Sequence, residues 1–370
     1  TPTSGFVGLN TANLPAPAIK DPSAHYNTHI YTGNGSARDI IFGNNTSMNP
    51  DLIWIKNRNT TDEWKVIDSP RGATKEVSLN NTGAEGTDSN GVDDLTVTDG
   101  FGLGSGAGGY NDNAEDFVSY NWLGADGAGS SNTDGSTNTT TTSANTTSGF
   151  SASTFTTPAS GTFTVGHGLD SAPDWFMIKQ TDAAGSWWVY HKDMTASPAD
   201  DYLVLTTTAA PAASTAVWAN AAPTSTVVSS TSGGTWLTGS KEHLLYAWHE
   251  VPGFSKFGSY IGNGSTTSGP FVFCSFRPSF VLIKRVSSAG SWTLVDIGRD
   301  PYNPTDTYFD VDTGGADTDG SANNVILDML SNGFKLRKNA GQVNATNATF
   351  VFMAFAERPS GEGVSQARAK

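Results

Sequence analysis

Short apolar runs separated by turn-forming residues recur along the whole chain. In its last third these runs are rich in β-branched and aromatic residues, and clusters of Gly, Asn, Asp and Pro separate them. This pattern is typical of antiparallel sandwiches and barrels. We expect strands there at residues 254–261, 271–276, 280–285, 292–297, 307–311, 325–330, 333–337 and 349–357, with a short helix as the alternative for 325–330.

The apolar pattern occurs three times. A proline opens an apolar run that ends in Ile-Lys at residues 50–56, 173–179 and 278–284. A Trp follows each proline at the same distance, as Trp64, Trp187 and Trp292. Self-similarity of this kind indicates copies of one structural unit. The runs at 52–55 and 281–283 are continuous rather than alternating, which indicates central strands buried on both faces or strands at a domain contact.

We therefore expect an all-β protein built from three tandem antiparallel β-sandwich repeats, jelly-roll-like and of about 100 residues each. Tyr26, Phe150 and Phe254 open similar segments in the three units. Residues 125–149 are almost purely small and polar, which indicates a Gly/Ser/Thr-rich linker or a long surface loop. The expected divisions are an N-terminal segment at 1–25, repeats at 26–124, 150–250 and 251–358, the linker at 125–149, and a C-terminal tail at 359–370.

Composition and charge exclude several classes of protein. The formal net charge is −14 and the pI is near 4.7, so we expect no nucleic-acid partner, because that binding depends on clustered Lys and Arg. No apolar run approaches the length of a membrane helix, and we expect no membrane insertion. Cys274 is the only cysteine, so no intrachain disulfide can form, and we expect a small buried hydrophobe at that position.

The lysine that ends each repeated run is the first candidate functional group. Lys56, Lys179 and Lys284 could be three equivalent cations that face a ligand. The alternative, which we favour, is a strand-end lysine whose stem packs while its ammonium reaches water.

Catalytic chemistry has little support in the sequence. His167 and His191 stand near carboxylates, as a base oriented by an acid would. Neither recurs in the other units and no Gly-x-Ser-x-Gly motif accompanies them, so we favour turn or surface histidines. Glycoside cleavage needs paired carboxylates, and no repeated pair occurs among Glu63, Glu76, Glu115 and Asp116. We expect no enzyme.

Metal and cofactor sites are also not expected. Residues 310–320 carry four carboxylates, Asp310, Asp312, Asp317 and Asp319, and alternating oxygen ligands suit Ca²⁺. The order does not match an EF-hand, so a solvated acidic loop is the favoured interpretation, and calcium binding is left open; Asp93, Asp94 and Asp99 form a looser analogue. The Gly-rich run at 100–106 is better explained by a turn into a strand than by a phosphate cradle. Acceptor-type sequons at Asn45, Asn145 and Asn344 arise readily from this composition.

Aromatic residues offer the one candidate ligand surface. Trp187, Trp188, Trp236 and Tyr302 could present flat faces to sugar rings. Because Trp187 holds a repeated position, we expect it in the core. Contact with a ligand is left open for Trp188 and Trp236, and the ligand-binding residues are otherwise unknown.

Several strings resemble a repeat domain of structural proteins of marine tailed phages, cyanophages included, which are described as tail-fibre-like or virion structural proteins. They lie at residues 50–58, 68–75, 99–104 and 251–264, and the last is the most specific. The resemblance covers about 26–358. The second unit departs from it, because it has Ala-Ser-Pro-Ala-Asp at 196–200 and lacks the Gly-Asn-Gly turn.

The resemblance implies a function and a location. We expect a virion protein on the tail or particle surface, extracellular, acting as a tail fibre or spike that attaches to a host surface glycan or protein without catalysis. Other virion proteins and further copies in a homotrimer are the implied partners. The alternative is a capsid or tail decoration protein with a purely structural role. In that family a sandwich often precedes the repeats, and residues 5–15 resemble the end of one, so we expect the chain to be a segment of a longer protein.

Overall fold

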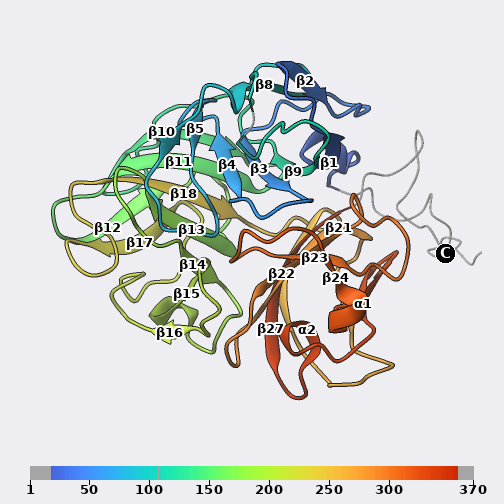
Figure 1. Cartoon of the computed structure of the whole chain (residues 1–370). Helices are drawn as coiled ribbons and strands as arrows, with labels where there is room; N and C mark the ends of the chain where they lie inside the picture. The colour runs from blue at the N-terminus through green and yellow to red at the C-terminus, as the bar shows by residue number, and fades with distance from the viewer. Residues whose placement is uncertain (1–17, 107, 357–370) are drawn as a thin grey trace, which may run out of the picture.

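Antiparallel sheets form nearly all of the structure, a computed structural model that describes residues 18–106 and 108–356 (Figure 1). Its helices are single turns, α1 (Gly320–Asn323), α2 (Gly341–Asn344) and the 3-10 turns η2 (Pro22–Ala24) and η3 (Pro198–Asp200). Within these described ranges no helix is long and apolar enough to cross a membrane. The C-terminal tail at 359–370 and the string at 5–15 lie outside the described residues.

Three larger sheets, here called sheets 1, 2 and 3, follow one another along the chain. Sheet 1 has the order β1 (Tyr26–Thr32), β9 (Asp116–Trp122), β3 (Leu52–Asn57), β4 (Lys65–Asp68). Sheet 2 has the order β10 (Thr139–Asn145), β11 (Phe150–Thr156), β18 (Glu242–Trp248), β13 (Trp175–Gln180), β14 (Trp188–His191), β15 (Asp201–Val204), β16 (Ala212–Ala213). Sheet 3 has the order β19 (Ser255–Ile261), β27 (Thr349–Ala356), β21 (Pro278–Arg285), β22 (Trp292–Asp296), β23 (Thr307–Asp310), β24 (Thr318–Asp319).

Each larger sheet is accompanied by a smaller one, and together they form the first, second and third regions of the chain. The smaller sheets are β2 (Arg38–Ile41), β8 (Gly100–Leu103) and β7 (Val92–Asp94) in the first region, β12 (Gly161–Gly166) and β17 (Val227–Ser232) in the second, and β20 (Phe271–Phe273), β26 (Gly333–Leu336) and β25 (Leu327–Leu330) in the third. A two-stranded ribbon, β5 (Lys75–Glu76) with β6 (Gly86–Thr87), follows β4.

The Ile-Lys runs form the central strands β3, β13 and β21, which hold the same place in their sheets. Each pairs with the last long strand of its own region, and the paired residues are Leu52 with Trp122, Trp175 with Trp248, and Phe280 with Phe355. Every residue of β3 and β13 is buried, as are the first seven of β21. The continuous apolar runs therefore mark strands covered on both faces, as expected.

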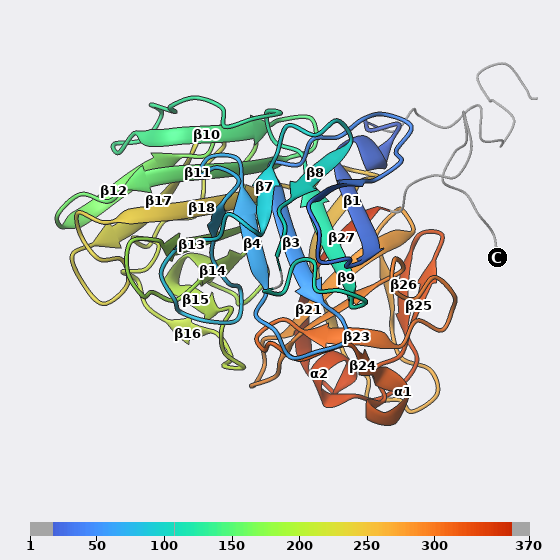
Figure 2. The same cartoon turned by 45° about the horizontal axis from the view of Figure 1, so that its top comes forward.

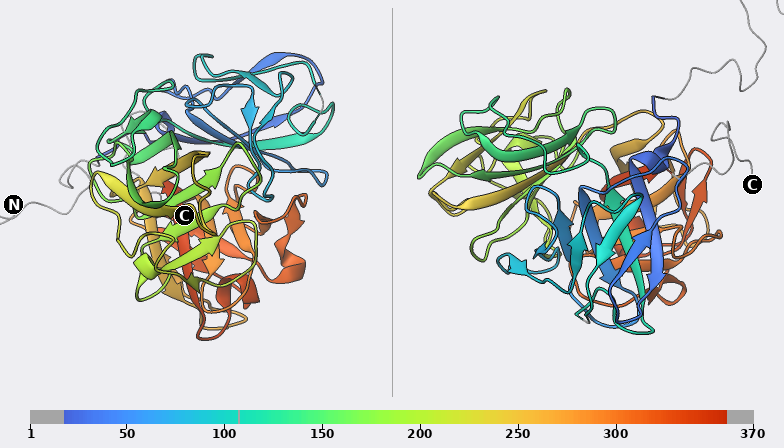
Figure 3. Two further views of the ribbon diagram at one scale, coloured as in Figure 1. Left: turned by 90° about the vertical axis from the view of Figure 1, so that its left-hand side faces the viewer. Right: turned by 90° about the horizontal axis from the view of Figure 1, so that it is seen from above.

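The second face of each larger sheet is covered by the other two. Trp122 of sheet 1 has its ring 6.0 Å from that of Trp248 in sheet 2 and 5.7 Å from that of Phe355 in sheet 3. Trp175 of sheet 2 lies 5.6 Å from Trp292 of sheet 3. Figures 2 and 3 show the three regions of the chain, blue to cyan, green to yellow and orange to red, meeting in the middle of the molecule. One apolar core thus joins all three sheets.

One repeated set of hydrogen bonds between the regions runs in the same direction around this core. In each region the Trp at the start of the strand after the central one (β4, β14 or β22), or the backbone N–H two residues before that Trp, donates to a carbonyl of the neighbouring region. The indole bonds are Trp64 to Thr313 at 3.1 Å, Trp187 to Ser78 at 2.7 Å and Trp292 to Val204 at 3.3 Å. The backbone bonds are Asp62 to Gly314, Gly185 to Thr82 and Gly290 to Thr208, each at 2.9 Å. The first region donates to the third, the second to the first and the third to the second, so the contacts close a ring.

The strand predictions for the last third are confirmed, with 325–330 containing strand β25 rather than a helix. The linker prediction is wrong for residues 139–145, because they form β10 and pair with β11 along its outer edge. Thr is β-branched and suits a strand, and four consecutive Thr residues begin this one. A composition of small polar residues therefore concealed an edge strand.

We expect the whole chain to unfold in one cooperative transition, because the three larger sheets share one core. Trp122→Ala should lower the free energy of unfolding by about 3–5 kcal/mol and move the entire transition, measured by thermal circular dichroism. Tyr302→Ala is the control, since Tyr302 is 75% exposed, and should have little effect. Separate transitions of which Trp122→Ala moves only one would contradict a shared core.

Candidate functional site

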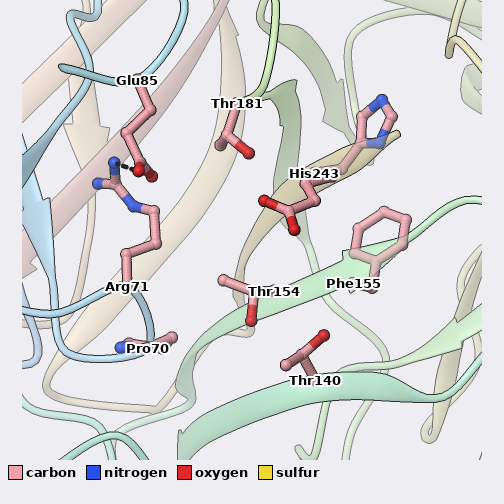
Figure 4. A pocket seen from close by; sticks show the side chains of 9 residues that line it. Pro70, Arg71, Glu85, Thr140, Thr154, Phe155, Thr181 and His243 are labelled. Carbon is pink, nitrogen blue, oxygen red and sulfur yellow. Dashed lines mark ion pairs between the residues drawn. The ribbon is translucent and has the colours of Figure 1, made fainter. Parts of the chain in front are cut away.

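A polar cavity of about 180 Å³ lies where the first and second regions of the chain meet (Figure 4). It is lined by Pro70, Arg71 and Glu85 from the first region and by Thr140, Thr154, Phe155, Thr181, Glu242 and His243 from the second. Figure 4 shows Arg71 and Glu85 on one side and Phe155 and His243 on the other. Glu242 and Thr140 are exposed, so the cavity opens to solvent.

The second region supplies hydroxyl and carboxylate groups from one face of sheet 2. Thr154 lies on β11, Glu242 begins β18 and Thr181 directly follows β13. Thr154 pairs with Leu244 and Lys179 pairs with the same Leu244, and side chains two residues apart on a strand share a face. Thr154, Thr181 and Glu242 therefore project from the same face, toward the first region of the chain.

Arg71 is held in place by a buried group of three side chains. Its Nε donates to Oδ2 of Asp68 at 2.6 Å and its Nη2 donates to the Val66 carbonyl at 3.0 Å. The hydroxyl of Tyr246, from sheet 2, donates to the same Asp68 carboxylate. Burial alone would lower the pKa of the Arg71 guanidinium, but the Asp68 carboxylate beside it raises that pKa instead, so the guanidinium stays charged.

One nitrogen of Arg71 has no hydrogen-bond acceptor. Nη1 lies 3.5 Å from Oε2 of Glu85 and is buried without a hydrogen bond. The Arg71 side chain is only 4% exposed. A buried charged donor of this kind is costly unless something accepts from it, so Nη1 is a group that a ligand could satisfy.

The contact between sheets 3 and 1 has the same three side chains but fills the space beside them. Arg299 donates to Asp296 at 2.5 Å, and Tyr120 donates to Asp296 at 2.8 Å. Here Nη1 of Arg299 pairs with Asp317 at 2.6 Å. Arg58, the residue after β3, pairs with the same Asp317 at 2.8 Å.

Thr181 is the reason for the difference. It follows β13 as Arg58 follows β3, and it is far smaller. At the remaining contact the corresponding positions are uncharged or apolar, since His191, Met194 and Met353 are all buried there. Two of the three contacts in the ring therefore contain an Asp–Arg ion pair, and the third is uncharged. At the contact between the first and second regions, the short side chain of Thr181 leaves room beside the ion pair.

His243 and Phe155 line the cavity from strands β18 and β11, but their rings project from the opposite face of sheet 2, because they alternate with Glu242 and Thr154. There the two rings stack at 5.6 Å, and Phe155 lies 6.0 Å from Phe163 of β12. Nδ1 of His243 lies 3.0 Å from the Lys241 carbonyl, which can only accept, so Nδ1 carries the proton and Nε2 is an acceptor. Nε2 is buried with no hydrogen-bond partner. Burial lowers the pKa of His243 to about 4, so this ring is neutral at physiological pH.

The arrangement offers groups that can bind a ligand. Glu85 contacts Lys75 at 3.2 Å as well as Arg71, and Glu242 is exposed at the opening. The cavity therefore offers a guanidinium, two carboxylates and three threonine hydroxyls as hydrogen-bonding groups.

The repeated lysines are buried, which corrects the expectation that their ammonium groups reach water. Lys56, Lys179 and Lys284 are fully buried. Their Nζ atoms donate to backbone carbonyls, at 2.7 Å to Asn57, 2.9 Å to Gly185 and 2.9 Å to Thr208. Each also lies over an aromatic ring, at 5.6 Å for Lys56 on Phe309, 5.6 Å for Lys179 on Trp187 and 5.5 Å for Lys284 on Trp292. The neighbouring sheet covers the strand end, so carbonyl oxygens and ring faces replace water.

The two candidate catalytic histidines hold turns. Nδ1 of His167 accepts from the Leu169 N–H at 3.1 Å, and Nδ1 of His191 accepts from the Asp193 N–H at 3.0 Å. Both are fully buried, so they are turn histidines but not surface ones. Burial lowers their pKa values, to about 4 for His167 and about 3 for His191.

The carboxylates of the acidic loop at residues 310–320 have separate structural roles. Asp312 accepts from the Trp292 N–H, Asp317 pairs with two arginines, and Asp319 caps α1. Burial raises the pKa of Asp310 to about 6. Among residues 18–106 and 108–356, no three His, Cys, Asp or Glu side chains are placed to hold a metal ion.

Other sequence candidates have structural roles. The Gly-rich run begins strand β8, as the turn-to-strand interpretation predicted. Cys274 is buried, and burial raises its pKa to about 12. Asn344 is also buried, which rules it out as an exposed glycan acceptor.

The aromatic candidates divide into core and edge. Trp187 is in the core, as expected. Trp188 and Trp236 are partly buried, and their rings pack edge-on with centroids 5.0 Å apart. The ring of Tyr202 lies 5.2 Å from that of Trp188 and 4.6 Å from that of Trp236. Tyr302 is exposed in another region of the chain. The rings are turned against one another rather than laid out as one flat platform.

Sequence reasoning missed the cavity. Arg71 and Asp68 stand in the string at 68–75 that carries the family resemblance, but nothing there distinguishes a structural ion pair from a site. A comparison of Arg58 with Thr181, at the same distance after their prolines, was the one available signal that the second position lacks a large side chain.

Arg71→Met should lower the free energy of unfolding by about 3–5 kcal/mol, because it leaves the Asp68 carboxylate buried and unpaired. Chemical denaturation measures this. The triple variant Asp68→His, Arg71→Met, Tyr246→Met copies the side chains of the third contact and should recover most of the loss. A triple variant that is less stable than Arg71→Met would contradict the equivalence of the contacts.

The contribution of Lys56, Lys179 and Lys284 to the free energy of unfolding should rise between pH 8 and pH 10.5, because burial lowers their pKa values from 10.5 to about 8. In this range these three lysines bind more protons in the unfolded chain than in the folded one, so their titration favours folding as the pH rises. Urea titrations at several pH values of the wild type and of the Lys→Met triple variant would measure it. The difference in slope should be about 1 kcal/mol per pH unit for each lysine, and equal slopes would contradict the buried lysines.

A comparison with known families extends over most of the chain. A family model described as a domain of unknown function, DUF7483, matches residues 21–359. No curated protein and no solved structure matches the chain. The matched range includes all three larger sheets and every residue of the cavity. The chain therefore belongs to the DUF7483 family.

Proposed function

We propose that the protein is a structural component of a tailed-phage particle, a tail fibre or spike that binds the host cell surface without catalysis. The resemblance of the strings at 50–58 and 251–264 to such proteins supports the particle. The observation that carries binding is the solvent-open polar cavity, which presents hydrogen-bonding groups but no nucleophile with a base. Its place is the tail or the outer surface of the virion.

We further propose that the chain consists of three tandem jelly-roll-like β-sandwich repeats. The shared strand order of the three larger sheets supports this, as does the identical pairing of their central strands. The ring of contacts also packs the three units against one another, which units joined only by linkers would not do. Such a rigid body is suited to holding a binding surface in place.

Partners in this proposal are other virion proteins and further copies in a homotrimer. The apolar faces that subunits of a trimer could cover are already covered within one chain, so the homotrimer rests on the resemblance. The large apolar side chains exposed in the third region support a contact with another protein. They are Ile261, Phe271, Phe273 and Tyr302.

A decoration protein of the capsid or tail is the second candidate. The closed ring supports it, because a single chain that covers its own faces can add to a shell as a preformed block.

Quantitative mass spectrometry of purified virions, with imaging of the same particles labelled through an antibody to this chain, tests the proposal. We expect few copies, in multiples of three, at the tail. Hundreds of copies over the shell would replace the fibre with the decoration protein. Absence of the protein from purified particles would overturn both.

A further inference from the structure

We propose that the cavity between the first and second regions of the chain binds one neutral sugar ring, a hexose or N-acetylhexosamine unit of a surface glycan. This rests on the proposed host-binding function and names the class of ligand for it. The size, the charge and the hydrogen-bonding groups of the cavity support this ligand, as does the occurrence of the cavity at one of two equivalent contacts.

The size suits a single ring. An apolar cavity of about 150 Å³ holds one benzene molecule, and this cavity measures about 180 Å³. A six-membered sugar ring with its hydroxyls fits this space, whereas a disaccharide would extend through the opening beside Glu242 and Thr140, both of which are exposed. A terminal sugar of a longer chain could therefore enter ring first.

The charge excludes a simple anion. One guanidinium, that of Arg71, lines the cavity with two carboxylates, that of Glu85, with which it is ion-paired, and that of Glu242. A phosphate or sulfate would gain one cation and meet two like charges. A neutral molecule that can both donate and accept avoids this repulsion.

The hydrogen-bonding groups match sugar hydroxyls. Nη1 of Arg71 can only donate and lacks an acceptor, while the carboxylates can only accept. A hydroxyl does both, so neighbouring hydroxyls of one ring can accept from Arg71 and donate to a glutamate. A ligand oxygen that accepts from Nη1 supplies the hydrogen bond that this buried donor otherwise lacks, and this hydrogen bond adds to the free energy of binding.

The site occurs at one of the two ion-paired contacts. At the other, Arg58 joins Arg299 on Asp317 and occupies the place that Thr181 leaves open. We therefore expect one sugar per chain, and an arginine at position 181 should close the cavity by pairing with Glu85 as Arg58 pairs with Asp317.

The test measures binding of methyl glycosides of glucose, galactose, mannose, N-acetylglucosamine and N-acetylgalactosamine to the full chain by saturation-transfer difference NMR. Sodium sulfate serves as the anion probe. We expect at least one glycoside to bind with a saturable signal and sulfate not to compete with it. Thr181→Arg should weaken that binding at least tenfold with the melting temperature preserved.

Two variants keep the result interpretable. Thr266→Arg makes the same chemical change at an exposed position of the third region and should leave binding unchanged. Glu242→Gln, at the exposed rim, should weaken binding without affecting folding, because it removes a carboxylate acceptor. It covers the case in which Thr181→Arg fails to fold.

Failure of all five glycosides to bind, displacement of the sugar by sulfate, or binding that survives both Thr181→Arg and Glu242→Gln would overturn the inference. These outcomes are separate from failure of the proposed function, which is decided by whether the protein is present in purified virions. A tail protein that binds no sugar would lose only the ligand class.

Discussion

The central strands β3, β13 and β21 are apolar on both faces, and each needs a layer of side chains on either side. A smaller sheet covers one face, and the other two larger sheets cover the second. No larger sheet can be removed without exposing the rings of Trp122, Trp248 and Phe355 to water. The ring of contacts therefore follows from burying both faces of three apolar strands within one chain. The other contacts between the sheets depend on this arrangement.

The polar groups at the sheet contacts follow from this burial. The indoles of Trp64, Trp187 and Trp292 and the ammonium groups of the three repeated lysines lie where one sheet meets the next, and each donates to a backbone carbonyl there. The Asp, Arg and Tyr groups at two contacts perform the same task with side chains, whereas His191 and the methionines at the third avoid charge. The cavity is a local exception, since Thr181 is far smaller than Arg58 and leaves room beside Arg71, whose Nη1 has no hydrogen-bond acceptor.

Strand positions were predictable because β-branched and aromatic runs bounded by Gly, Asn and Pro specify them locally. The packing of the three larger sheets against one another was not predictable, because it depends on which face of each sheet contacts which neighbouring sheet. Lys56 illustrates the difference: its strand was predicted, but its burial depends on a sheet formed about 200 residues or more later in the chain. β10 escaped notice because threonines serve equally in loops and edge strands. The cavity depends on Thr181 being much smaller than Arg58 at the equivalent position, and no local motif indicates that difference.

Hydrogen exchange of the indole N–H protons of Trp64, Trp187 and Trp292 tests the closed ring most directly. Each proton is bonded to a carbonyl of the neighbouring region, so it can exchange only when that contact opens. If the ring is closed, all three protons exchange with one free energy, equal to that of global unfolding. Exchange of one indole at a much lower free energy, with the other two still protected, would show that a region detaches alone and would contradict a single closed ring.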